Sequence, residues 1–322
     1  MSARALAFST VVLCSGCCAQ MSIHGVVSGY VLDGRSGTVR PVLGIPGAAY
    51  LGTALSLPWG VTALGIRGSR DIAVAISQEQ PRRAYVVHGL SGAATAARLE
   101  AILPDSDRVF LSADGSAAAI VSTSQQQVQI VTNLASAPAV SDALPLALRG
   151  KITTVAVSNS GCALVAGADD QSGQLVEICA ANPGAVIPIF DRDAFRPTAV
   201  AWLSDQKVAV ADAASNQVLL FANLDGSAPT VLLDRSSGID SPVGLVAVDS
   251  STMAVAITGG AALVVARTDG SRPPRIVALP VAPSQLEALD SPSILVSNAL
   301  LDFPLLLVDV QQDYSAFFVP MN

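Results

Sequence analysis

Short, β-rich apolar runs recur along the chain at a nearly constant spacing. The runs read DIAVAIS, SAAAIVS, CALVAGA, KVAVADA, MAVAIT and SILVSN. Their centres are separated by 45, 45, 45, 46 and 40 residues and lie at Val74, Ala119, Leu164, Ala209, Val255 and Leu295. A period of 40 to 46 residues without helical patterning is typical of a propeller blade. We therefore predict an all-β fold, a β-propeller of four-stranded antiparallel blades.

Each repeat can be divided into four strands. In residues 152–190 the strands read ITTVAVS, CALVAGA, QLVEICA and AVIPIF, with NSG and DDQSG as turns between the first three. Gly, Asn, Asp and Ser at these joints supply the positive φ angles and local hydrogen bonds that tight hairpins need. The pattern therefore predicts one antiparallel sheet for each repeat.

The number of blades depends on the N-terminal repeat. Six inner hairpins are recognisable, but there are seven outer hairpins, because residues 30–43 form an outer hairpin with no obvious inner partner. We predict seven blades in one domain, 20–322, with six blades plus an N-terminal closing hairpin as the alternative. The predicted blades are an incomplete first blade at 20–56, then about 57–107, 108–151, 152–195, 196–240, 241–285 and 286–322. The N- and C-terminal strands of such rings often share a blade, which closes the ring.

The N-terminus, MSARALAFSTVVLCSGCCAQ, reads as a secretory signal peptide over residues 1–19. Cleavage before Gln20 suits a general signal peptidase, whereas Cys14-Ser15-Gly16-Cys17 resembles a lipoprotein box and would place a lipid on Cys17. We expect a secreted or periplasmic protein, with a lipid-anchored protein of the cell envelope as the alternative. No other segment has the ~18 consecutive apolar residues of a transmembrane helix, so none is expected in the mature chain.

The charge distribution argues against nucleic acid as a partner. The chain has 18 Lys and Arg against 25 Asp and Glu, a formal charge of −7, and its longest basic run is Arg82-Arg83. Binding to phosphate backbones needs clustered positive charge. We therefore expect a protein or glycan partner for a monomeric chain.

Two cysteines, Cys162 and Cys179, lie outside the first eighteen residues. If the strands around them pair about a turn between Asp170 and Gln171, the numbers of paired residues sum to 341, as 162 and 179 do. The two thiols then lie opposite each other on one face of a hairpin, within disulfide range. An oxidising compartment favours the bond. The sequence predicts a Cys162–Cys179 disulfide, against two buried free thiols or a metal or redox site.

Few residues could support catalysis. The chain has two histidines, His24 and His88, which are too few for a multi-histidine metal site and argue against a serine–histidine triad. Trp59 and Trp202 are expected to start inner strands as core residues.

Carboxylate and amide oxygens form the one candidate site. In a propeller, the loops between second and third strands and the links between blades share one face. Five residues of these loops could converge at the channel mouth, namely Glu79, Asp212, Asn216, Asn298 and Asp302. Such oxygens are the ligands of Ca²⁺ or Mg²⁺. The alternative is that they cap strand ends and face water.

One repeat carries a family resemblance. KVAVADAASNQVLLF, residues 207–221, resembles the NHL-type or YVTN-type propeller repeat: a strand ending in Val-Ala-Asp, a polar loop with Asn, and an apolar strand ending in Phe. It departs from those repeats at Gln217, where they favour Arg or Lys. The resemblance implies the architecture, and a divalent ion at the channel mouth would resemble the site of lactonase-type propellers.

Two functions therefore remain open. The first is a binding or scaffolding module at the cell envelope that uses its loop-rich face. The second is a lactonase-like hydrolase in which a divalent ion polarises the ester carbonyl and activates water. The sequence leaves open whether the protein is an enzyme.

Overall fold

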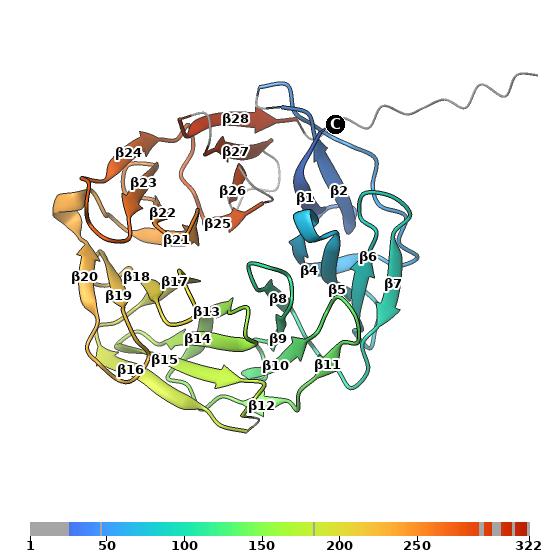
Figure 1. Cartoon of the computed structure of the whole chain (residues 1–322), viewed down its shortest axis with the longest axis horizontal. Helices are drawn as coiled ribbons and strands as arrows, with labels where there is room; N and C mark the ends of the chain where they lie inside the picture. The colour runs from blue at the N-terminus through green and yellow to red at the C-terminus, as the bar shows by residue number, and fades with distance from the viewer. Residues whose placement is uncertain are drawn as a thin grey trace, which may run out of the picture.

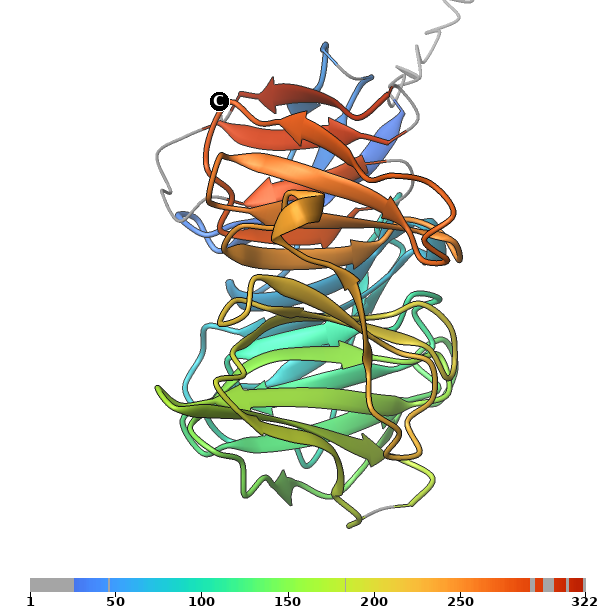
Figure 2. The same ribbon diagram turned by 90° about the vertical axis from the view of Figure 1, so that its left-hand side faces the viewer.

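The computed structural model describes residues 26–45, 47–182, 184–289, 293–297, 304–310 and 313–320. Within these ranges, seven antiparallel sheets stand around a central axis as the blades of a ring (Figure 1). Seen from the side, the strands run roughly along the axis of the ring (Figure 2). The structure confirms the all-β propeller and selects seven blades over six.

The first four blades follow one another in chain order. Blade 1 consists of β1 (Val27–Asp33), β2 (Thr38–Leu43) and β3 (Tyr50–Leu51). Blade 2 consists of β4 (Val61–Arg67), β5 (Ile72–Ser77), β6 (Ala84–His88) and β7 (Thr95–Arg98). Blade 3 consists of β8 (Arg108–Leu111), β9 (Ala118–Ser122), β10 (Gln127–Thr132), β11 (Ala139–Val140) and β12 (Leu144–Pro145), the last two both paired with β10. Blade 4 consists of β13 (Lys151–Val157), β14 (Cys162–Ala168), β15 (Ser172–Cys179) and β16 (Ile187–Asp193).

The last three blades complete the ring. Blade 5 consists of β17 (Pro197–Trp202), β18 (Val208–Asp212), β19 (Gln217–Phe221) and β20 (Thr230–Leu233). Blade 6 consists of β21 (Pro242–Ala247), β22 (Thr252–Ile257), β23 (Ala262–Arg267) and β24 (Arg275–Ala278). Blade 7 consists of β25 (Gln285–Ala288), β26 (Ser293–Ser297), β27 (Leu305–Asp309) and β28 (Ser315–Val319). Two short 3₁₀ helices, η1 (Gly68–Arg70) and η2 (Arg235–Ser237), lie in turns. Among the described residues, no helix is long and apolar enough to cross a membrane.

The repeated apolar runs are the second strands of the blades, which are covered on both faces. In β18, Ala209 and Ala211 pack against blade 6. Their neighbours Val208 and Val210 point the other way and pack against blade 4. A strand buried on both faces reads as a continuous apolar run, which explains the signal that recurs in the sequence.

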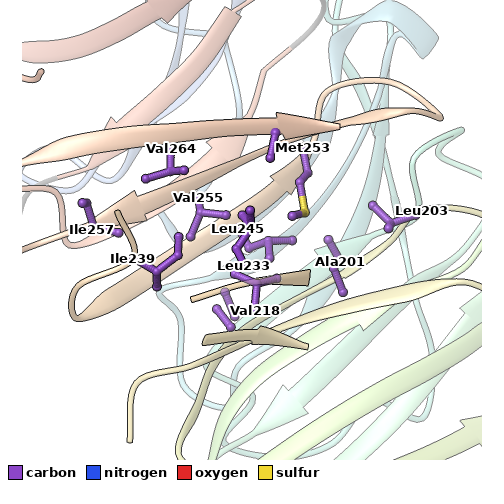
Figure 3. Close-up of a cluster of buried hydrophobic side chains, with 14 of the residues drawn as sticks. Ala201, Leu203, Val218, Leu233, Ile239, Leu245, Met253, Val255, Ile257 and Val264 are labelled. Carbon is purple, nitrogen blue, oxygen red and sulfur yellow. The ribbon is translucent and has the colours of Figure 1, made fainter. Parts of the chain in front are cut away.

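Neighbouring blades are held together by side chains from facing sheets. Between blades 5 and 6, Leu203, Val218 and Leu233 meet Leu245, Met253 and Val255 (Figure 3). Ile239, on the segment that links the two blades, is fully buried in the same cluster. Burial of each large apolar side chain stabilises the fold by about 1.5–3 kcal/mol. The core is thus divided into layers, one between each pair of blades.

Four inner strands have a β-bulge near their start. The pairing of the inner with the second strand shifts by one residue and leaves one residue unpaired in each of four blades, namely Thr62, Thr153, Thr198 and Val243. A bulge redirects the side chain of the extra residue. All four residues line the centre of the ring. The hydroxyls of Thr153 and Thr198 donate to the carbonyl oxygens of Ala166 and Pro242 and so join neighbouring strands.

Blade 1 closes the ring without sharing a sheet with the C-terminal strands. In the described part of the chain, β1 to β3 pair only with one another, and β25 to β28 form a separate sheet. Val31, Val42 and Leu51 of blade 1 pack against Leu295 and Leu307 of blade 7. On its other face, Tyr30 and Val39 pack against blade 2. The general expectation of a shared blade was wrong here, because the N-terminal hairpin packs on both neighbours through side chains.

Candidate functional site

A central channel runs between the inner strands and has a volume of about 1070 Å³. Its wall includes residues from the inner strands of six blades: β4, β8, β13, β17, β21 and β25. Of the described residues, none from blade 1 belongs to the wall. The ring of inner strands therefore has one open sector, between β25 of blade 7 and β4 of blade 2.

Most residues of the channel wall are apolar by type, but about half of the surface that the wall exposes is polar. Its apolar side chains include Leu64, Phe110, Val200, Trp202, Leu245, Val246 and Leu286. Trp202 is the last residue of β17, so the prediction that it starts an inner strand was wrong. Its indole Nε1 donates a hydrogen bond of 3.2 Å to the carbonyl oxygen of Ala156, which fixes the ring in the wall. A wall that combines apolar side chains with polar groups is typical of a ligand pocket.

The wall contains five charged side chains: Arg67, Asp107, Arg108, Asp249 and Glu287. The carboxylate of Asp107 accepts hydrogen bonds from the backbone N–H and the hydroxyl of Thr123. Asp249 accepts hydrogen bonds from the N–H and Oγ of Ser251, at 2.6 and 2.8 Å. These two carboxylates therefore hold local turns together.

The two arginines of the wall bind backbone carbonyl groups. Arg108 donates from Nη1 to the carbonyl oxygen of Thr153 at 3.2 Å, across the boundary between blades 3 and 4. Arg67 donates from Nε to Ser112 at 3.1 Å and from Nη1 to Ala288 at 3.5 Å. Arg67 thus connects blade 2 with blade 3 and with β25 of blade 7, on either side of the open sector.

Glu287 differs from the other acids of the wall. Among the described residues, it makes no hydrogen bond or ion pair. Its side chain is half-buried in the channel. Removal of bulk water raises the pKa of its carboxyl above the ordinary value of 4.5, although the charge of Arg67 acts in the opposite direction.

The raised pKa gives Glu287 a predictable effect on stability. The folded state holds this proton more tightly than the unfolded state, so stability falls as the pH rises from about the ordinary value of 4.5 through the higher folded-state pKa. Glu287→Gln removes this loss. We expect the Tm of the variant to exceed that of the wild type above this pH range and to match it below the range. Glu79→Gln, at an exposed position, controls for the change in net charge, and equal pH profiles for all three proteins would contradict the assignment.

The structure places two of the predicted oxygen ligands, Asp212 and Asn216, at the two ends of one turn, between β18 and β19. Asp212 is fully buried and accepts four hydrogen bonds. Asn216 Oδ1 accepts the N–H of Ser241 at 2.5 Å and so ties blade 5 to the start of blade 6. The side-chain oxygens of both residues therefore bind protein groups.

Glu79, a third predicted ligand, is not brought to this turn. Glu79 is on the turn between β5 and β6 of blade 2, is exposed, and lies 3.6 Å from the guanidinium of Arg83. Blades 2 and 5 are not neighbours in the ring (Figure 1). Asn298 and Asp302 lie outside the described residues. The Ca²⁺ or Mg²⁺ site remains a prediction.

The cysteine pair is a disulfide. Cys162 and Cys179 face each other in the register of β14 and β15, with Cα atoms 4.0 Å apart, and their sulfurs are bonded. Glu177 lies close to both sulfurs, and burial raises the pKa of its carboxyl. Because both sulfurs are in the bond, neither is a thiolate ligand, and the pair acts as a covalent link between two strands. The signal peptide and Cys17 lie outside the described residues.

Comparisons with solved structures show the same architecture. A protein from Lactobacillus plantarum matches with a TM-score of 0.62 and 13% identity over 91% of this chain and 94% of that chain. Virginiamycin B lyase from Staphylococcus aureus matches with a TM-score of 0.58 and 12% identity over 83% of this chain and 87% of the lyase. YCF48 bound to D1 peptide matches with a TM-score of 0.57 and 10% identity, covering 85% of this chain and 90% of YCF48.

These similarities identify the architecture. The chain has the fold of a seven-bladed β-propeller, the architecture that the resemblance of residues 207–221 implied. At such low identities the likeness shows the fold alone. No family model matches the chain, and no curated protein matches its sequence.

Three residues of the channel were not predicted from the sequence as functional, namely Glu287, Arg67 and Trp202. Glu287 stands in QLEAL, where the strand pattern alternates apolar and polar residues as on any half-exposed strand. A charged residue in the interior of an inner strand, rather than at its end, is the signal that could have identified it. Arg67 and Trp202 carried no such signal, because each is the last residue of its strand.

Proposed function

We propose that this chain is an extracytoplasmic binding module whose central channel receives an apolar segment of a partner peptide or protein. The observation that carries the proposal is the channel itself, with a volume of about 1070 Å³ and a wall of six blades in which large apolar side chains alternate with polar groups. Ligand pockets commonly measure about 300–1,000 Å³ and combine apolar side chains with polar groups. Large apolar side chains such as Leu64, Phe110 and Trp202 favour a peptide segment with apolar side chains over a glycan.

The compartment is supported by two independent features. The N-terminal sequence reads as a secretory signal. The Cys162–Cys179 disulfide is a bond that persists in oxidising compartments such as the periplasm and the cell exterior. Both features fit a module that works outside the cytoplasm, whether released or held at the envelope by a lipid on Cys17.

The hydrogen bonds of the candidate ligands favour binding over metal-assisted hydrolysis. Such hydrolysis needs open coordination positions on an ion held by several oxygen ligands. In the described part of the chain, Asp212 and Asn216 direct their oxygens to protein donors. Solved propellers of this architecture include both a lyase and a protein bound to a peptide, so the fold by itself favours neither function.

Trp202 provides a direct test of ligand entry into the channel. In the Trp59→Phe variant, Trp202 is the remaining tryptophan, and its emission reports on the channel wall. We expect N-acetyl-Leu-norleucine-Leu-amide to produce a saturable blue shift of this emission, because the peptide displaces water from the indole. The Trp202→Phe variant, which keeps Trp59 stacked on Tyr85, should show no such shift.

Metal dependence distinguishes the two functions. The titration is repeated in EDTA and then with Ca²⁺ or Mg²⁺, and Tm is measured in parallel. If neither Tm nor the affinity for the peptide changes when metal is added, the result would agree with a metal-independent module. A saturable rise in Tm with metal, about 2.7 kcal/mol of stabilisation at 100 times the dissociation constant, together with no peptide signal, would replace the proposal with the hydrolase.

A further inference from the structure

The position of Glu287 in blade 7 can be derived from its neighbours. Leu286 and Ala288, the residues on either side of it in β25, pack against blade 6. Because side chains alternate along a strand, Glu287 lies on the opposite face of β25. Leu295, its partner on β26, packs against blade 1. Glu287 therefore faces the side of blade 1.

Blade 1 supplies no described residue to the channel wall on that side. Elsewhere in the ring, the residues between two inner strands are enclosed by apolar layers. In the open sector, no described residue of blade 1 reaches the wall beside Glu287. Arg67 crosses the sector from β4, and its Nη1 lies 3.5 Å from the carbonyl oxygen of Ala288, the residue next to Glu287.

In the described part of the chain, the Arg67 guanidinium donates hydrogen bonds to backbone carbonyl groups and not to the carboxylate of Glu287. Its guanidinium donates to the carbonyl groups of Ile66, Leu111 and Ser112, in addition to Ala288. The charge of Arg67 lowers the pKa of Glu287, but desolvation outweighs it. The half-buried carboxylate therefore keeps its hydrogen-bonding capacity for a ligand that enters the channel.

We infer that Glu287 is the recognition group for a primary ammonium, which the partner segment inserts from the channel into the open sector. The inference rests on the proposed function, since it names the charged group carried by the apolar segment. An ammonium supplies both the opposite charge and the N–H donors that the carboxylate needs. The charge of −7 on the whole chain also favours the approach of a cationic ligand.

The test compares three peptides that differ at one position. N-acetyl-Leu-X-Leu-amide is prepared with X as lysine, N-ε-acetyllysine or norleucine, and binding is followed by Trp202 emission in the Trp59→Phe background. We expect the lysine peptide to bind at least about tenfold more tightly than the acetyllysine peptide, which corresponds to 1.4 kcal/mol. Glu287→Gln should abolish this preference and leave the affinity for the norleucine peptide unchanged.

Two controls make the result specific. Glu177→Gln neutralises another half-buried carboxyl that lies on blade 4 outside the channel wall, and it should keep the lysine preference. The Tm of each variant shows that it is folded. Butylammonium alone is the last probe: affinity equal to that of the lysine peptide would support a free amine as the ligand, and weaker binding would support a lysine side chain.

The outcomes separate the two proposals. Equal affinities of all three peptides for the wild type would overturn ammonium recognition and leave the channel as a binding site. The same lysine preference in Glu287→Gln would also overturn it. Absence of any saturable signal with all three peptides would overturn the proposed function together with the inference.

Discussion

Replacement of Asp212 by alanine is expected to lower the free energy of unfolding by about 3 kcal/mol, because it removes the buried acceptor of two backbone N–H groups and each unsatisfied buried donor costs about 1–3 kcal/mol. Asp212 is fully buried. Its Oδ1 accepts the backbone N–H groups of Arg196 and Ala214, at 2.9 and 3.0 Å. Its Oδ2 accepts hydrogen bonds from Arg192 Nη2 and Ser215 Oγ, at 2.8 and 2.5 Å. Alanine would leave all four donors without this acceptor.

The side chain of Arg192 adds to the cost. It lies over the rings of Phe190 and Phe195, with distances of 5.6 and 5.7 Å to the ring centroids. Asp212 therefore anchors both a turn of blade 5 and a guanidinium of blade 4. Urea unfolding measures the change, with Asp205→Ala as the control, because Asp205 is exposed on the next turn towards the N-terminus. Such a surface change usually costs within about 0.5 kcal/mol, and a similar small effect of Asp212→Ala would refute the network.

Loss of the Cys162–Cys179 disulfide is expected to cost about 3 kcal/mol, because the bond closes a short loop and reduces the entropy of the unfolded chain. The two residues are 17 positions apart in the sequence. For a chain of this length, the loss corresponds to a fall in Tm of about 5 °C. Differential scanning calorimetry of the Cys162→Ser/Cys179→Ser double variant measures this fall.

A reductant provides the matched control for the disulfide. Dithiothreitol should lower the Tm of the wild type towards that of the double variant and leave the double variant unchanged. If the wild type and the double variant melt at the same temperature, the hairpin pairing of β14 with β15 holds this blade without help from the bond. Peptide mapping without reduction would show directly whether the two thiols are joined.

The repeats predicted the fold because each one meets the same physical demand. A second strand covered by blades on both faces must be apolar throughout, and this run recurs in six of the seven blades. The disulfide was predictable for a related reason: pairing in a hairpin is determined by its turn, so the turn at Asp170 and Gln171 brings Cys162 opposite Cys179. Local patterns and short-range pairing were sufficient for both.

The candidate site depends on contacts that the sequence does not display. Asp212 reads as an exposed oxygen ligand until Arg192, twenty residues earlier, is seen to fold back on it across the blade boundary. Glu287 is a candidate recognition group because no described residue of blade 1 belongs to the channel wall beside it. Both facts arise only when the ring is closed, because they involve residues from different blades.

The construction of blade 1 also determines how the ring responds to mechanical load. A pull on the N-terminal end of the described chain enters at β1, which pairs with β2 alone among the described strands. The side-chain contacts of Val31 with blade 7 and of Tyr30 with blade 2 then bear the tension. If a lipid on Cys17 holds the protein at a membrane, blade 1 is therefore the part of the ring that bears the load. Its detachment would break the side-chain contacts that join blade 7 to blade 2 through blade 1.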